Sequence, residues 1–390
     1  MYMKFKLFIV CLGLCVTFAS HAQIRISQLG GSSNPITVAV PFLSFSPDSR
    51  GSAMGDVGVA TDPSPYSVHW NNSKLAFVED DMAFSFSYSP WLGNIVDDMS
   101  LNYLTFYKRI DPIQTFGVTM RYFDLGEIQL TDNTGQSIGL ENPREAAIDA
   151  TYARKLTENL SAGLSMRFIW SNLAGSITGG QSADAGTSLA FDMGVYYRKP
   201  LVVGGLNSQL SLGTHLSNIG QKISYTTEEF EDFIPGNLRL GTAFKINLDS
   251  YNVINLAIDV NKLMVPTPPE YDLDTRQIIR GKDPDRPFLS GTFGSFGDAP
   301  NGPSEEFQEL MYSFGIEYVY NNIFAVRTGY FLEHENKGDR KFFTIGMGFK
   351  YQVFGIDISY LIPQVQGHPL GDTLRLSLKF NMQKQQEGDL

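Results

Sequence analysis

The chain has almost no cysteine, little histidine and no long apolar run beyond its N-terminus. Its only two cysteines among 390 residues, Cys11 and Cys15, lie within the first 22 residues. Downstream of this leader a disulfide framework and a cysteine-based metal site are therefore excluded. No later stretch approaches about 18 consecutive apolar residues, which excludes a transmembrane helix there.

Positive charge is also scarce. Lys and Arg number 30 against 41 Asp and Glu, which gives a formal net charge of −11. An acidic chain without a basic patch is repelled by phosphate backbones, so we expect no nucleic acid among its partners.

Common enzyme motifs are missing too. The sequence has no GxSxG nucleophile elbow, no HExxH zinc helix and no phosphate-binding loop. The run Asp272-Leu273-Asp274 resembles the start of a calcium loop, but Gln277 stands where that loop type needs glycine. We therefore expect a protein that is not an enzyme, with no catalytic residues, no metal and no cofactor.

The first 22 residues have the pattern of a secretory signal peptide. Lys4 and Lys6 give a short basic region, residues 7–18 an apolar run, and residues 20–22 a small-residue cleavage site. We expect cleavage before Gln23. Because the mature chain then has no cysteine, its fold must be stabilised by size, by sheet closure or by its surroundings.

Alternating apolar and polar residues dominate the rest of the chain. In residues 342–351, FFTIGMGFKY, Phe343 and Ile345 fall on one side of an extended chain and Thr344 and Gly346 on the other. Fourteen such strands are predicted, at 82–89, 101–110, 114–123, 145–156, 160–170, 186–198, 208–217, 236–246, 251–261, 309–320, 323–332, 340–350, 353–361 and 372–381.

The connections distinguish a soluble sandwich from a membrane barrel. Those after even-numbered strands are mostly tight turns, with one medium exception at 199–207. Those after odd-numbered strands are long: 90–100, 124–144, 171–185, 218–235, 262–308, 333–339 and 362–371. Outer-membrane barrels have short periplasmic turns and long outer loops. We therefore predict an all-β fold, a 14-stranded antiparallel transmembrane β-barrel in the cell outer membrane.

The two faces of the strands support the barrel. Large apolar residues would face lipid, and tyrosine and tryptophan near strand ends would form interfacial girdles. The girdle residues would be Trp170, Tyr196, Tyr197, Tyr318, Tyr320, Tyr330 and Tyr360. The other face is small, polar or charged, and its glycine content favours a lumen with something packed against the wall.

Charged residues on the second face are expected to point into the lumen. They are Arg121, Asp149, Arg167, Asp192, Asp259, Arg327, Asp357 and Arg375. A buried charge needs a partner, so we expect these to pair with each other or with Asp48, Arg50 and Asp56. A conduction path for solutes is the alternative. His215 also points inward, and we expect a hydrogen-bonded wall residue.

Four regions follow from these patterns. They are a signal peptide at 1–22, an N-terminal hatch or plug in the lumen at 23–81, the barrel at 82–381 and a periplasmic tail at 382–390. The apolar content of residues 23–81 argues against the alternative, a disordered leader.

The connection at 262–308 is the longest and has seven prolines. Proline holds segments extended and leaves backbone groups free for a strand-adding partner, so this loop is a candidate partner-binding site. Its candidate contact residues are Pro266, Pro268, Pro269, Tyr271, Arg276, Arg280, Phe288, Phe293 and Phe296. A flexible surface loop without a partner is the alternative.

Residues 39–77 carry several short elements in order that resemble the N-terminal region of the PorV family. The hatch motif comprises Pro41, Phe42, Leu43, Asp48, Arg50, Met54, Gly55, Asp56, Gly58, Trp70 and Asn71. PorV proteins are outer-membrane components of the Bacteroidetes type IX secretion system and belong to the wider FadL-like barrels. Asn71-Asn72-Ser73 departs from the looser FadL-like pattern, Asn-Pro-Ala.

The resemblance implies a binding and shuttle function. PorV-like proteins accept secreted cargo from a giant translocon barrel (SprA or Sov) and recognise its C-terminal signal domain. They carry it to an attachment complex that contains the sortase-like protease PorU, where it is joined to lipopolysaccharide. The alternatives are a FadL-like channel for long-chain fatty acids or other hydrophobic solutes, and a lipid A- or lipopolysaccharide-modifying hydrolase.

Overall fold

The computed structural model describes most of the chain between residues 33 and 382. Residues outside the description are 1–32, 94, 95, 97, 132, 133, 174–184, 226–230, 273, 365–370, 372 and 383–390. The expected signal peptide and nearly all of the expected tail are among them. The chain divides into residues 1–33 and 34–390, and the account below concerns the second unit.

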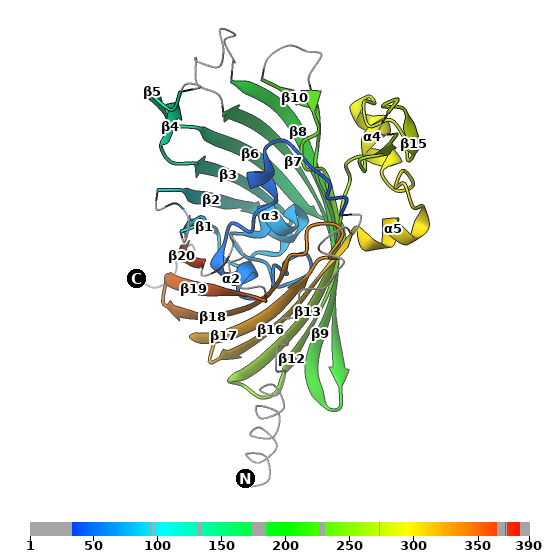
Figure 1. The fold of residues 1–390 in the computed structure, drawn as a ribbon. Coiled ribbons are helices and arrows are strands. Elements are labelled where there is room, and N and C mark those ends of the chain that lie inside the picture. The colour runs from blue at the N-terminus through cyan, green and yellow to red at the C-terminus, as the bar shows by residue number, and fades with distance from the viewer. Residues whose placement is uncertain are drawn as a thin grey trace. The chain divides into compact units, whose positions relative to one another are not determined.

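Fourteen antiparallel strands form one closed barrel (Figure 1). They are β1 (Met82–Pro90), β2 (Ser100–Asp111), β3 (Gln114–Asp124), β6 (Arg144–Lys155), β7 (Leu160–Asn172), β8 (Gly186–Val203), β9 (Leu206–Gly220), β12 (Asn237–Asn247), β13 (Asn252–Leu263), β16 (Leu310–Tyr320), β17 (Phe324–Leu332), β18 (Lys341–Tyr351), β19 (Phe354–Pro363) and β20 (Leu374–Met382). Pairing of β1 with β20 closes the sheet and leaves no free edge. The predicted fourteen-stranded antiparallel barrel is confirmed.

The apolar face of the wall points outward. On β18, Phe343 and Ile345 are 48% and 49% exposed, whereas Thr344 between them is 1% exposed. A soluble sheet protein would bury the large residues instead. Exposed large residues and buried polar ones are typical of a barrel whose outer face meets lipid and whose inner face encloses polar residues.

The medium connection at 199–207 is a correction to the prediction. Strand β8 continues to Val203 and β9 begins at Leu206, so only Gly204 and Gly205 connect them. Both glycines have positive φ, 60° and 81°, as the two-residue hairpin turn that matches strand twist requires. The alternation of short turns and long loops therefore has no exception here.

Tyr196 is a second correction. It was expected in an interfacial girdle, but it is fully buried on the inner face and its hydroxyl donates to Ser211 Oγ at 3.0 Å. Successive side chains of a strand point to opposite faces, so Tyr196 points inward because its neighbour Val195 points outward.

The long loops carry elements that the sequence patterns did not predict. Three small hairpins are formed by β4 (Ile128–Thr131) with β5 (Ser137–Glu141), β10 (Ile223–Ser224) with β11 (Glu231–Asp232), and β14 (Glu270–Tyr271) with β15 (Ile278–Arg280). Two short helices, α4 (Phe288–Gly294) and α5 (Pro303–Gln308), lie in the longest loop. Among the described residues, no helix has both the length and the apolar character needed to cross a membrane.

Residues 34–78, here called the luminal segment, lie within the barrel (Figure 1). They form four short helices: η2 (Pro41–Ser44), α2 (Ser49–Ser52), α3 (Ser67–Trp70) and η3 (Asn72–Phe77). Apolar side chains of this segment, such as Val40 and Leu43, pack in one cluster with wall residues Leu101 and Phe123. The luminal segment and the inner face of the wall therefore share a hydrophobic core.

Candidate functional site

Charged and polar contacts join the luminal segment to strands β13 and β16 of the wall. Arg50 forms an ion pair with Glu317 on β16 at 2.9 Å. The backbone N–H groups of Gly58 and Val59 both donate to one carboxylate oxygen of Asp259 on β13, at 2.7 and 2.9 Å. Asp259 and Arg50 therefore lie where the sequence predicted a meeting of wall and N-terminal charges, although Asp259 bonds to backbone rather than to a basic side chain.

Asp48 joins two distant parts of the luminal segment. Its carboxylate caps α2 by accepting from Gly51 N at 2.9 Å, and it also accepts from Trp70 Nε1 at 2.6 Å. Asp48 and Trp70 of the hatch motif are thus 22 residues apart in the sequence but form one buried hydrogen bond. Adding a Cβ to Gly51 or Gly58 would bring it within 2.4 or 2.2 Å of the Trp70 ring, so both positions need glycine.

Wall glycines allow the segment to approach the strands closely. A Cβ on Gly163 would lie 2.5 Å from Ser73 N, and one on Gly329 would lie 2.0 Å from the carbonyl carbon of Met54. Asn72 donates to Ser165 Oγ at 2.8 Å in the same region. Where the looser FadL-like pattern has proline, this chain has Asn72, and the side-chain amide of Asn72 contacts the wall.

The eight lumen charges are all buried, and most of them lie in two clusters. Arg167 pairs with Asp149 and, at 2.9 Å, with Asp192. Arg327 pairs with Asp357 at 2.7 Å and with Glu317 at 2.6 Å. Glu317 was missed by the sequence reasoning, although its place on the small and polar face of β16 was a usable signal.

Three further inward arginines have no carboxylate at ion-pair distance among the described residues: Arg121, Arg239 and Arg375. Arg121 bonds to the ring of His69 and donates to Leu43 O at 2.7 Å. His215 is buried, and neither of its ring nitrogens has a described partner, which differs from the expected hydrogen-bonded wall residue.

A cavity of about 330 Å³ lies between the luminal segment and the wall at the end that carries the long loops. Its apolar lining includes Trp70, Trp91 and Phe331, and its cations include Arg239 and Arg375. A second, polar cavity of about 550 Å³ is lined by Arg50 and Pro63 of the segment. The luminal segment thus borders one largely apolar space and one largely polar space.

The long loop (residues 262–308) is folded rather than uniformly extended. Pro287 directly precedes α4, and Pro303 is the first residue of α5, the position where proline favours a helix start. Of the nine candidate contact residues, Pro266 and Pro269 are buried and Pro268 and Phe288 are half-buried. The exposed ones are Tyr271, Arg276, Arg280, Phe293 and Phe296.

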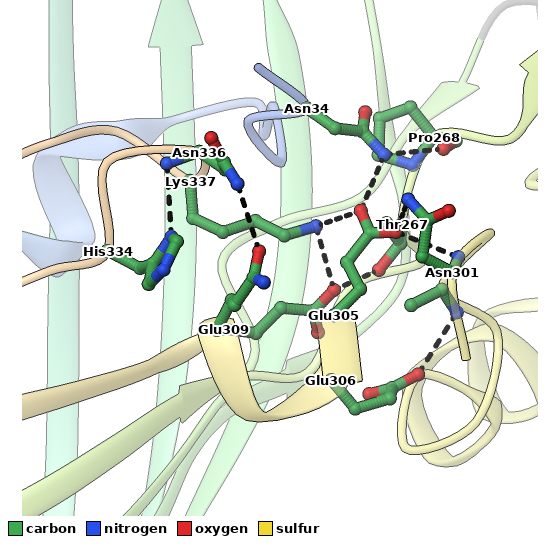
Figure 2. Close-up of polar contacts among 12 residues, drawn as sticks. Asn34, Thr267, Pro268, Asn301, Glu305, Glu306, Glu309, His334, Asn336 and Lys337 are labelled. Carbon is green, nitrogen blue, oxygen red and sulfur yellow. Dashed lines mark hydrogen bonds and ion pairs between the residues drawn. The ribbon is translucent and has the colours of Figure 1, made fainter. Parts of the chain in front are cut away.

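A polar cluster joins the long loop to the start of the luminal segment and to the loop at 333–340 (Figure 2). Asn34 Nδ2 donates to Pro268 O and to Glu305 Oε1, both at 3.0 Å. Lys337 Nζ contacts Glu305 at 2.7 Å and Glu309 at 3.1 Å. Burial alone would raise the pKa of Glu305, but hydrogen bonds from Lys337, Asn301 and Asn34 leave that pKa below its usual value.

Comparisons with known proteins identify the family. The family profile described as Type IX secretion system protein PorV matches residues 30–270. No curated protein matches the chain. Among solved structures, the CymD monoaromatic hydrocarbon channel shares the fold, at 13% identity and a TM-score of 0.51 over 86% of this chain and 98% of that one.

Two further structures are similar at lower TM-scores. The Ralstonia pickettii toluene transporter TbuX is 13% identical, with a TM-score of 0.47 over 87% of this chain and 98% of that one. A Pseudomonas aeruginosa FadL homologue is 10% identical, with a TM-score of 0.45 over 90% and 99%. Since the profile match spans more than half of the sequence, this outer-membrane β-barrel belongs to the PorV family of type IX secretion system proteins.

Proposed function

We propose that this protein binds the C-terminal signal domain of translocated cargo and carries it from a translocon barrel (SprA- or Sov-like) to an attachment complex containing a PorU-like sortase. Membership of the PorV family supports a role in type IX secretion. In this proposal the barrel is a binding and transfer protein and not the enzyme of the attachment step.

The folded long loop is the observation that carries the proposal. The hairpin β14–β15 of this loop exposes Tyr271, Arg276 and Arg280. The ion pair between Glu305 and Lys337 holds the base of the long loop. A two-stranded hairpin has free edges, and a β-rich signal domain could add a strand to one of them. A fixed base reduces the entropy lost when such a partner binds.

The partner role of the hairpin is testable by its removal. Pro269 and Gly281 flank the hairpin and lie next to each other, so a two-glycine turn can replace residues 270–280. We expect loss of cargo co-purification with an intact, membrane-inserted barrel. The matched control replaces residues 129–140 of the β4–β5 hairpin by two glycines and should still capture cargo. Normal cargo capture and secretion by the first variant would refute the proposed loop function.

A channel for hydrophobic solutes is the second candidate. The cavity of about 330 Å³ favours it, because tryptophans beside Arg239 and Arg375 would suit an apolar chain with an anionic end. Titration of the purified barrel with a fluorescent long-chain fatty acid tests this function. Saturable binding that weakens in Arg375→Ala would support it, and the absence of saturable binding to the wild type would exclude it.

A further inference from the structure

The outer wall of the barrel carries an apolar groove beneath the long loop. Outward residues of three strands form its wall side, and two phenylalanines around α5 form its loop side. The six apolar residues that define this groove are Leu238, Leu240, Val260, Leu310, Phe296 and Phe307. Its volume is about 640 Å³, within the range of roughly 300–1,000 Å³ typical of sites for small organic ligands.

The groove is continuous with the lipid-facing surface. On β13, Leu256 and Ile258 are exposed on the outer face, Val260 follows them into the groove, and Lys262 comes next. On β12, Leu240 is 48% exposed and also lines the groove. The groove thus lies at the edge of the apolar band, at the end of the barrel where the long loops begin.

Lys262 on β13 joins the wall to the long loop through ionic and cation–π contacts. An outward lysine on a lipid-facing strand would be costly without a partner. Its ammonium contacts Glu306 at 3.1 Å and also Glu309, and it lies 5.4 Å from the centre of the Phe296 ring. Because two carboxylates already neutralise this lysine, it offers no free positive charge to an anionic headgroup.

The loop itself presents apolar side chains to its surroundings. Leu289 and Phe293 are four residues apart on α4 and are both more than half exposed, and Phe307 on α5 is 71% exposed. Exposed apolar groups in such number on one loop mark an interaction surface. Together with the groove they would remain in water unless lipid or protein covers them.

We propose that an acyl chain of an outer-leaflet lipid occupies this groove, and that the long loop rests on the membrane surface through Phe307 and α4. The wall side of the groove is made of residues whose strand neighbours already face lipid, which favours lipid over a second protein. Since Lys262 is neutralised, the groove recognises the chain and not the headgroup. Lipid binding in this groove does not depend on cargo transport.

Lipid retention tests the groove directly. The wild type, Leu240→Trp and Ile316→Trp are each reconstituted with phosphatidylglycerol or with phosphatidylethanolamine of the same chains, exchanged into detergent and measured by native mass spectrometry. Leu240→Trp fills the groove, whereas Ile316 is outward and 48% exposed but lies outside it. We expect one retained lipid of either type on the wild type and on Ile316→Trp, and at least tenfold less on Leu240→Trp. Equal retention by Leu240→Trp, no retention by the wild type, or dependence on one headgroup would overturn the proposal.

The position of the loop is tested by fluorescence in vesicles with brominated acyl chains. Trp170 lies near the long-loop end of β7, so Trp170→Phe is the background, and the emission of the buried Trp70 and Trp91, measured in Trp170→Phe alone, is subtracted. In it, Phe307→Trp is expected to be quenched several-fold more than Tyr271→Trp on the hairpin of the same loop. Equal quenching at the two positions would overturn the proposal. Shielding of position 307 in a cross-linked dimer would overturn it in favour of a second copy of this chain.

Discussion

Single residues in this barrel show how closely the luminal segment and the wall determine one another. Gly329 and Gly163 were visible in the sequence only as small residues on the inward face of a strand. Both positions need glycine because the backbone of Met54 or Ser73 lies where the Cβ of any other residue would be. A strand pattern identifies the face on which such a glycine lies, but the segment that approaches it is distant in sequence and has no periodicity to reveal it.

Gly329→Ala tests this close approach. The new methyl group would meet main-chain atoms of Met54 and Gly55, which cannot rotate away, so we expect a loss of about 1–3 kcal/mol in the free energy of unfolding. The measurement is urea unfolding of the barrel in lipid vesicles. Gly236→Ala is the control, because its nearest neighbours lie at 3.5 Å and its methyl group should be tolerated. Equal stability of both variants would show that the segment can shift away from the wall.

At the scale of elements, period-two alternation was sufficient to predict all fourteen barrel strands, because lipid outside and a polar lumen inside impose opposite demands on successive residues. It failed where turn chemistry or loop packing decides. Gly204-Gly205 carried a hairpin signal that the prediction did not use. Helices α4 and α5 are too short for a helical period, and tertiary contacts such as Lys262 with Glu306 hold them in place.

The polar cluster at the base of the long loop is predicted to weaken in acid. Glu305 has a depressed pKa in the folded protein, so its contribution to stability is present above its usual pKa, near 4.5, and is lost as the pH falls through the lower folded value. We expect amide hydrogens around α5 and Asn34 to exchange faster, relative to the strands, at pH 3 than at pH 7. Glu305→Gln should exchange faster already at pH 7 and respond less to acid. An unchanged difference between the two pH values in Glu305→Gln would assign the acid response to other groups.

At the scale of the whole molecule, the luminal segment is proposed to act as a plug. It borders both cavities, and its contacts reach β13, β16 and β18 through Asp259, Glu317 and Thr344. If the segment blocks the bore, deleting residues 34–78 should produce stepwise ion conductance in planar bilayers where the wild type gives none.

Deletion of the luminal segment also leaves Asp259 without its two N–H donors, so the barrel could fail to assemble. The double variant Arg50→Gln with Asp259→Asn avoids this problem, since it keeps the segment and a polar side chain at both positions while it weakens two contacts. Brief openings in that variant would support a plug held by these contacts, and a wild type that conducts as freely as both variants would show that the lumen is open with the segment in place.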